Sequence, residues 1–290
     1  MSWSALAAIV IWGFSFIATK VAIREVHPFG LMALRFGIGA LLLSIIQFSR
    51  DKRFLSHFSA RDWTQVFLLA LVGIASHNLI QAYGLLYTTA INTGWIIAAQ
   101  PLFITLSACL FLGERITLRK IIGLFLGFFG VSLIITKGIF SLAVFHWSSS
   151  LGDFLILFSA VTWTIFTVGG RRFLSRFPPL AAVVPIMTVG FLMSLLVSML
   201  RTEWNIHFHL SLAAWASVLF LGIFCSGVAY FFWYSALEKK DSSSVGMYLY
   251  LEPLVTLLGA CLLLGERAPW VTLAGGGITL AGVFLATRKI

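Results

Sequence analysis

The chain has 290 residues, of which 60% are hydrophobic and only 10% are charged, and its mean hydropathy is +0.99. A soluble domain carries about 25% charged residues, so this composition excludes a water-soluble globular protein. The formal net charge of +10 comes from short basic loops rather than from a basic stripe, so no nucleic-acid partner is expected.

Apolar stretches recur along the chain, each close to the roughly 20 residues that a helix needs to cross a bilayer. They predict ten spans: Ser2–Val21, Phe29–Phe48, Trp63–Leu86, Ile91–Leu112, Leu118–Thr136, Leu151–Val168, Leu180–Leu200, Leu212–Ala236, Ser243–Leu264 and Trp270–Thr287. No long stretch shows the period-two alternation of a strand, so the expected fold class is an all-α polytopic membrane protein. The N-terminal apolar run lacks a basic region before it, so it is interpreted as the first span.

Basic residues separate into two sets when the connecting loops are assigned alternately to the two sides of the membrane. One side holds four of them, Arg24, Lys137, Arg201 and Arg267. The other side holds fourteen: Arg50, Lys52, Arg53, Arg61, Arg115, Arg119, Lys120, Arg171, Arg172, Arg176, Lys239, Lys240, Arg288 and Lys289. Cytoplasmic loops carry the excess of lysine and arginine, so both termini are expected to be cytoplasmic.

A long segment of the chain occurs twice. Pro101–Arg115 returns as Pro253–Arg267, 152 residues later, with ten of fifteen residues identical, which indicates two copies of one unit. Five spans per copy is an odd number, so the second copy enters the membrane from the opposite side. We therefore expect two inverted five-helix repeats, residues 1–137 and 151–290, joined by an outer linker over residues 138–150. Repeats of this kind enclose a central site that opens alternately to either side.

Three motifs resemble the EamA family of the drug/metabolite transporter superfamily: the twofold PL…LGER pattern, WGFSF at Trp12–Phe16, and ALRFGIGALLL at Ala33–Leu43. The resemblance covers essentially the whole chain. It implies ten helices, cytoplasmic termini and a central cavity between two halves. It also implies a bacterial inner (plasma) membrane and export of amino acids, other metabolites or toxic compounds. Among its members, the chain is most similar to aromatic-amino-acid and paraquat exporters.

Span 3 is the most polar at mid-depth. His77 and Gln81 are four residues apart and share a helix face, with Asn78 beside them. A polar side chain in hydrocarbon needs a partner or a water-filled cavity. We expect these three residues to bind substrate in a cavity, and the alternative is that His77 and Asn78 only bond neighbouring helices.

Span 9 carries a polar stripe at i+4 spacing, formed by Ser244, Tyr248, Glu252 and Thr256. Glu252 is the one acid near the middle of a predicted span, where charge is expensive. Its first interpretation is an ion pair with Arg35 of span 2. The other two are a counter-ion for a substrate amine and a proton-coupling site. Tyr248 and Glu252 are both predicted to contact substrate.

Each copy also places a proline near the middle of a span, Pro101 in the first and Pro253 in the second. Proline kinks a helix and frees a carbonyl group, so matched prolines point to a binding region, although a purely structural bend is equally compatible. Gln100 before the first proline is the counterpart of Glu252 before the second, and it is predicted to line the same site.

Aromatic side chains at mid-span need a reason other than anchoring at the membrane surface, because an indole N–H or phenol O–H requires a partner. Trp163 of span 6 and its counterpart Trp12 of span 1 meet this description, as do Tyr230 and Tyr234 of span 8. All four are predicted to line an aromatic part of the cavity.

The sequence carries no nucleotide-binding loop and no H-E-x-x-H motif, so neither an enzyme nor direct use of ATP is expected. Cys109, Cys225 and Cys261 lie in apolar spans without C-x-x-C spacing, so no disulfide, metal site or cofactor is expected. The expected function is secondary export of small metabolites, foremost aromatic or other neutral amino acids, with toxic organic compounds as further substrates. A sugar-phosphate or nucleotide-type carrier of the same fold and a gated channel are the alternatives. The expected partners are the substrate and the lipid bilayer, with a monomer and a homodimer both open.

Overall fold

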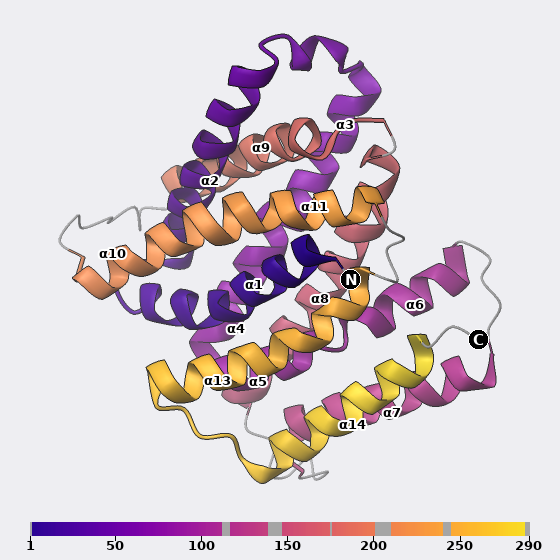
Figure 1. Cartoon of the computed structure of the whole chain (residues 1–290). Helices are drawn as coiled ribbons and strands as arrows, with labels where there is room; N and C mark the ends of the chain where they lie inside the picture. Colours follow the sequence, from indigo (N-terminus) through magenta and orange to yellow (C-terminus); the bar gives the residue numbers. More distant parts are fainter. Residues whose placement is uncertain are drawn as a thin grey trace.

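The computed structural model of the chain describes residues 2–111, 117–138, 147–174, 176–200, 210–239 and 245–287. Within these ranges every regular element is helical and no strand occurs, which confirms the all-α prediction (Figure 1). Large apolar side chains cover the outside of the bundle, among them Leu212 (87% exposed) and Leu262 (82%). A surface of this kind belongs in lipid, as expected for a multi-pass membrane protein.

Six helical stretches in the described residues are long and apolar enough to cross a membrane. They are α1 (Trp3–Ala22), α2 (Pro28–Arg50), α3 (Ala60–Leu69) continuing into α4 (His77–Tyr87), α8 (Trp147–Leu174), α9 (Pro179–Leu200), and α10 (Leu212–Leu219) continuing into α11 (Ala229–Lys239). Shorter apolar helices lie on the other predicted spans: α5 (Ala90–Ile97) with α6 (Gln100–Phe111), α7 (Leu118–Thr136), α13 (Glu252–Leu264) and α14 (Trp270–Thr287). A short 3₁₀-helix, Phe54–His57, precedes α3.

Some predicted features fall on parts of the chain that the structure does not describe. Glu114 and Arg115, at the end of the first repeated segment, lie outside the described residues, as do residues 139–146 of the predicted linker. The last part of that linker is helical, because α8 begins at Trp147 rather than at the predicted Leu151.

Two of the long stretches contain a π-helical segment that the sequence did not predict. The first is Ala70–Ser76, between α3 and α4, and the second is Phe220–Val228, between α10 and α11. Moving the first by the repeat offset of 152 residues gives 222–228, which falls inside the second. A π turn leaves backbone carbonyl groups outside the regular bonding pattern, and such turns are frequent at functional sites. The two segments therefore mark equivalent points of the repeated sequence.

Spans 4 and 9 are not the continuous helices that the sequence predicted. Span 4 is divided into α5 and α6, and α6 begins at Gln100, directly before Pro101. Span 9 is described from a 3₁₀-helix at Met247–Leu251 and becomes α-helical at Glu252, directly before Pro253. Proline has no N–H to donate, and the first turn of a helix needs none, so proline is favoured there. The two prolines thus begin helices rather than kink them.

Helices α7 and α14 lie side by side along their length, in backbone contact (Figure 1). A Cβ atom at Gly130 of α7 would lie 2.5 Å from the carbonyl oxygen of Gly275 and 2.5 Å from Oγ1 of Thr279, both on α14. A Cβ atom at Gly282 would lie 2.5 Å from the backbone nitrogen of Gly127. Small residues allow this approach, which is how helices pack in lipid without a hydrophobic driving force between them.

A polar network joins four helices and the loop before α14 at one end of the bundle, and we call it the Lys20–Glu266 network. Lys20, at the end of α1, bonds the carbonyl oxygen of Thr88 after α4 and pairs with Glu266 at 3.5 Å. The Glu266 carboxylate accepts from the first two amide groups of α5, each at 3.1 Å. The hydroxyl group of Thr88 donates to Asp153 of α8. Segments far apart in the sequence are thereby held together where α1, α4, α5, α8 and the loop before α14 meet.

Two helix N-termini are also linked to distant parts of the chain. Ser59 and Asp62 form a capping box at the start of α3, and the Asp62 carboxylate is 2.5 Å from a guanidinium nitrogen of Arg176. At the start of α10, Ser211 donates to the Glu25 carboxylate from its backbone nitrogen at 2.8 Å and from its hydroxyl group at 2.6 Å. These two hydrogen bonds stabilise the ionised form, so they lower the pKa of Glu25.

Candidate binding cavity

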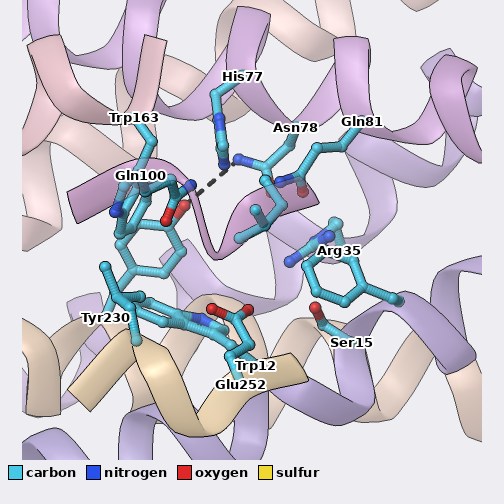
Figure 2. Close-up of a pocket in the computed structure, with 13 residues that line it drawn as sticks. Trp12, Ser15, Arg35, His77, Asn78, Gln81, Gln100, Trp163, Tyr230 and Glu252 are labelled. Atoms are coloured by element: carbon cyan, nitrogen blue, oxygen red, sulfur yellow. Dashed lines mark hydrogen bonds between the residues drawn. The ribbon is translucent and has the colours of Figure 1, made fainter. Parts of the chain in front are cut away.

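A cavity lies among the helices at mid-bundle, and polar and aromatic side chains from seven helices face it (Figure 2). The thirteen lining residues are Trp12, Ser15, Phe16, Arg35, His77, Asn78, Gln81, Ile97, Gln100, Trp163, Tyr230, Leu249 and Glu252. Eight of the ten residues predicted to bind substrate are among them. The space between these side chains is ≈ 380 Å³, counting the part open to solvent.

Three aromatic rings form one wall of the cavity. The Trp12 ring of α1 meets the Trp163 ring of α8 edge to face at 5.1 Å, and meets the Tyr230 ring of α11 at 5.4 Å. These separations and angles are those that aromatic pairs prefer. The Trp12 indole N–H donates to the carbonyl oxygen of Cys225, in the second π-helical segment, at 3.1 Å. The predicted aromatic cluster therefore exists for these three residues.

Tyr234 and Tyr248 are predicted site residues that the structure does not place at the cavity. Tyr234 lies one helical turn beyond Tyr230 and packs against Phe166, with ring centroids 5.8 Å apart. The Tyr248 hydroxyl group accepts a hydrogen bond from the backbone nitrogen of Ser2 at 2.6 Å. The i+4 stripe assumed an α-helix, but Tyr248 belongs to a 3₁₀-helix. Over four residues the two helix types differ by roughly 80° of rotation, so Tyr248 and Glu252 face different directions.

His77 is fixed by a hydrogen bond to a backbone carbonyl group of α8. Its Nδ1 lies 2.9 Å from the carbonyl oxygen of Ser159 and 3.1 Å from Oγ1 of Thr162, both on α8. A carbonyl oxygen can only accept, so Nδ1 carries the hydrogen, and in a neutral ring Nε2 is left as an acceptor. The ring also packs against Trp163 at 5.1 Å. His77 therefore both bonds a neighbouring helix and lines the cavity, so the two interpretations of span 3 are not exclusive.

Asn78 donates hydrogen bonds to two carbonyl groups of the first π-helical segment. Its Nδ2 lies 3.3 Å from the carbonyl oxygen of Gly73 and 3.1 Å from that of Ile74. The same nitrogen lies 3.3 Å from the hydroxyl oxygen of Tyr230. One amide group thus stabilises the π turn and orients an aromatic residue of the cavity wall.

Replacing Asn78 by aspartate should destabilise the protein, although the two side chains have the same shape. The amide donors would become carboxylate oxygens facing two carbonyl oxygens, and a buried unmatched polar contact costs about 1–3 kcal/mol, more for a charged group. We expect a lower midpoint of thermal unfolding in detergent and weaker binding of any cavity ligand. Gln81→Glu is the control for stability, because no backbone carbonyl among the described residues accepts a hydrogen bond from Gln81. An equal loss of stability in both variants would contradict this role of Asn78.

The predicted ion pair between Arg35 and Glu252 does not form. The Arg35 guanidinium donates from Nε to the Ser226 hydroxyl group at 3.1 Å and lies over the Phe36 ring at 5.0 Å. Glu252 opens α13 on another side of the cavity (Figure 2). Ser226 belongs to the second π-helical segment, which the sequence did not reveal, so this alternative partner of Arg35 could not be foreseen.

Arg35 is the charged cavity residue that was not predicted to bind substrate. The sequence could have indicated this role, because an arginine near the middle of a span is rare and usually marks a functional site. The sequence analysis instead explained Arg35 by the expected ion pair with Glu252. The other unpredicted lining residues, Ser15, Phe16, Ile97 and Leu249, have no feature that separates them from ordinary packing residues.

Comparisons with known proteins agree on one family. The model of the EamA-like transporter family matches residues 2–136 and 150–288. An uncharacterized transporter of Archaeoglobus fulgidus is 35% identical over 281 residues, which cover 97% of this chain and 94% of the relative. A probable terminal-alkyne amino-acid exporter of Streptantibioticus cattleyicolor is 28% identical and aligns with 99% of this chain and 93% of its own length.

A crystal structure shows the same fold. It superimposes with a TM-score of 0.71 over 99% of this chain and 97% of the other, at 22% sequence identity. At that level of identity the likeness concerns the arrangement of the helices alone.

Proposed function

The chain belongs to the EamA-like transporter family, and from this premise we propose that it is a secondary transporter that exports small metabolites, foremost amino acids. The observation that carries the proposal is the mid-bundle cavity, in which aromatic, polar and charged side chains face one space. Support also comes from the S. cattleyicolor relative, which is described as a probable amino-acid exporter. Family members are transporters, so the cavity is a binding site rather than a catalytic one.

We propose the same architecture that the sequence predicted: ten membrane spans in two inverted repeats, residues 1–137 and 151–290. The family model matches the chain twice, in ranges close to these halves. The long and the shorter apolar helices follow the ten predicted spans in order. The π-helical segments occupy equivalent positions in the two copies. With the basic loops inside, both termini would be cytoplasmic, in a bacterial inner membrane.

Transport would proceed by alternating access, with the cavity opening to one side and then to the other. The Lys20–Glu266 network supports a carrier rather than a pore, because it ties helix ends together on what would be the outer side. Contacts of this kind can break and re-form between two states, whereas an open channel needs a continuous lined path.

Counterflow in vesicles that contain the purified protein tests the proposed function. Vesicles loaded with unlabelled phenylalanine, leucine or alanine should accumulate the same labelled amino acid, and the rate should saturate with concentration. Protein-free vesicles and vesicles loaded with a sugar phosphate are the controls. Absence of exchange with every amino acid, or exchange only with the sugar phosphate, would overturn the proposal.

Labelling of paired positions tests the inverted repeat. Arg61 and Ala213 are 152 residues apart, are both exposed, and lie in the first turns of α3 and α10. In a background without native cysteines, we expect a membrane-impermeant thiol reagent to label Arg61→Cys from the inside and Ala213→Cys from the outside. Labelling of both from one side would contradict the inverted arrangement, whatever the substrate is.

A further inference from the structure

Two opposite charges face the cavity without touching. Arg35, on α2, and Glu252, at the start of α13, are the charged side chains among the thirteen residues that line it. Each is only 4% exposed. In the part of the chain that the structure describes, neither has an ion-pair partner. Figure 2 shows them on different sides of the same space.

Both groups keep unused bonding capacity. The described residues provide one hydrogen bond to the Arg35 guanidinium, at Nε, so its two terminal NH₂ groups are open. They provide none to the Glu252 carboxylate, whose oxygens are not sealed off from the cavity. A buried charge without a partner is strongly unfavourable. A ligand that compensates both charges at once would therefore bind with a more favourable free energy than a ligand that compensates only one.

We propose that this cavity recognises a zwitterion: a substrate that carries a carboxylate for Arg35 and an ammonium group for Glu252. The inference rests on the proposed function and narrows its substrate class to α-amino acids with uncharged side chains. The guanidinium fork matches a carboxylate in bidentate geometry. The three rings of Trp12, Trp163 and Tyr230 form the wall that would receive an apolar or aromatic side chain.

The balance of charge in the cavity separates this class from the alternatives. One guanidinium and one carboxylate sum to zero, so a net-neutral ligand leaves no charge uncompensated. A sugar phosphate or nucleotide would bring two or more negative charges to a single cation. A dicationic toxicant would bring two positive charges to a single carboxylate. Either ligand would leave one protein charge buried without a partner, which a specific site penalises strongly.

The two charged residues also belong to different copies of the repeated sequence. Arg35 precedes the Pro101–Arg115 segment of the first copy, and Glu252 directly precedes the Pro253–Arg267 segment of the second. A bound zwitterion would bridge them. Binding would thus hold the two parts of the cavity wall at a set separation, which single-charge ligands cannot do.

Competition binding with three ligands of the same shape tests the proposal. Purified protein is saturated with labelled phenylalanine, which is displaced by unlabelled phenylalanine, by 2-phenylethylamine, which lacks the carboxylate, or by 3-phenylpropionate, which lacks the amine. For the unaltered protein, we expect each single-charge ligand to bind at least about thirtyfold more weakly than phenylalanine, or roughly 2 kcal/mol. Similar affinity for all three would overturn the proposal, and equal affinity for phenylalanine and 3-phenylpropionate would show that Glu252 binds no ammonium group.

Variants of the two charged residues give a crossed pattern that misfolding cannot imitate. Arg35→Gln should weaken phenylalanine about thirtyfold and leave 2-phenylethylamine within about threefold. Glu252→Gln should weaken phenylalanine equally and leave 3-phenylpropionate within about threefold. The surface changes Arg53→Gln and Glu238→Gln should alter none of the three. Partial misfolding lowers the number of sites but not the ratio of affinities, so a uniform loss for all ligands would overturn the proposal.

Two failures are distinguishable. If the unaltered protein exchanges amino acids in vesicles but does not discriminate among the three ligands, the zwitterion site is wrong and the exporter stands. If it exchanges no amino acid, the proposed function fails and the zwitterion site with it.

Discussion

Transport should fall by at least about tenfold when Trp163 is replaced by alanine, even in protein that reaches the membrane in normal amount. The Trp163 ring contacts Trp12 and His77, each at 5.1 Å, and Tyr230 at 6.1 Å. Removing it takes away the ring that joins the aromatic wall of the cavity to the polar side chains of α4. Truncating a buried tryptophan also costs about 3–5 kcal/mol of stability. Binding and folding therefore have to be measured separately.

The measurement is counterflow of labelled phenylalanine, normalised to folded protein from size-exclusion chromatography. Trp270→Ala is the matched control, since the side chain of Trp270 is 79% exposed and should be dispensable for transport. Trp163→Phe should recover part of the activity, because a smaller ring still fills part of the wall. Unchanged phenylalanine counterflow in Trp163→Ala would exclude this residue from the binding site.

The second large effect is expected for Gly130→Ala, at a position that does not line the cavity. The new methyl group would lie 2.5 Å from a carbonyl oxygen and 2.7 Å from a backbone nitrogen of α14. Backbone atoms cannot turn away as a side chain can, so α7 and α14 would have to separate. Overpacking of this kind costs about 1–3 kcal/mol and more where nothing can yield. We expect a large drop in the yield of monodisperse protein and in the midpoint of thermal unfolding.

Gly277→Ala is the control for this prediction, because Gly277 lies on α14, the helix that α7 contacts, and a Cβ atom there would meet nothing within 4 Å. Alanine favours a helix over glycine by about 1 kcal/mol, so Gly277→Ala should be neutral or stabilising. If the two variants are equally stable, the α7–α14 contact is not as close as the structure shows.

The sequence predicted the structural features that depend on the length and polarity of its segments. Apolar stretches located the helices, and rare polar groups at mid-span, such as His77 and Gln100, proved to face one cavity. Polar groups at mid-span can be located in this way because lipid penalises unpartnered polar groups, so those that occur are concentrated where water or a ligand can reach them.

What could not be predicted depends on the rotation of each helix about its axis. Periodicity arguments assume 3.6 residues per turn, and two π-helical segments and one 3₁₀-helix violate it. Tyr248 was misplaced for this reason. Arg35 was assigned to Glu252 because complementary charges are visible in a sequence, whereas the distance between their helices is not.

The α7–α14 contact and the Lys20–Glu266 network differ in how each can be undone. Glycine backbones in van der Waals contact cannot separate partly without losing the contact. We therefore expect α7 and α14 to move together as one rigid unit. Hydrogen bonds of lysine, glutamate and threonine can instead be exchanged for water, at small net cost and without damage. The α7–α14 contact would thus stay intact throughout each transport cycle, whereas the Lys20–Glu266 network could break and re-form.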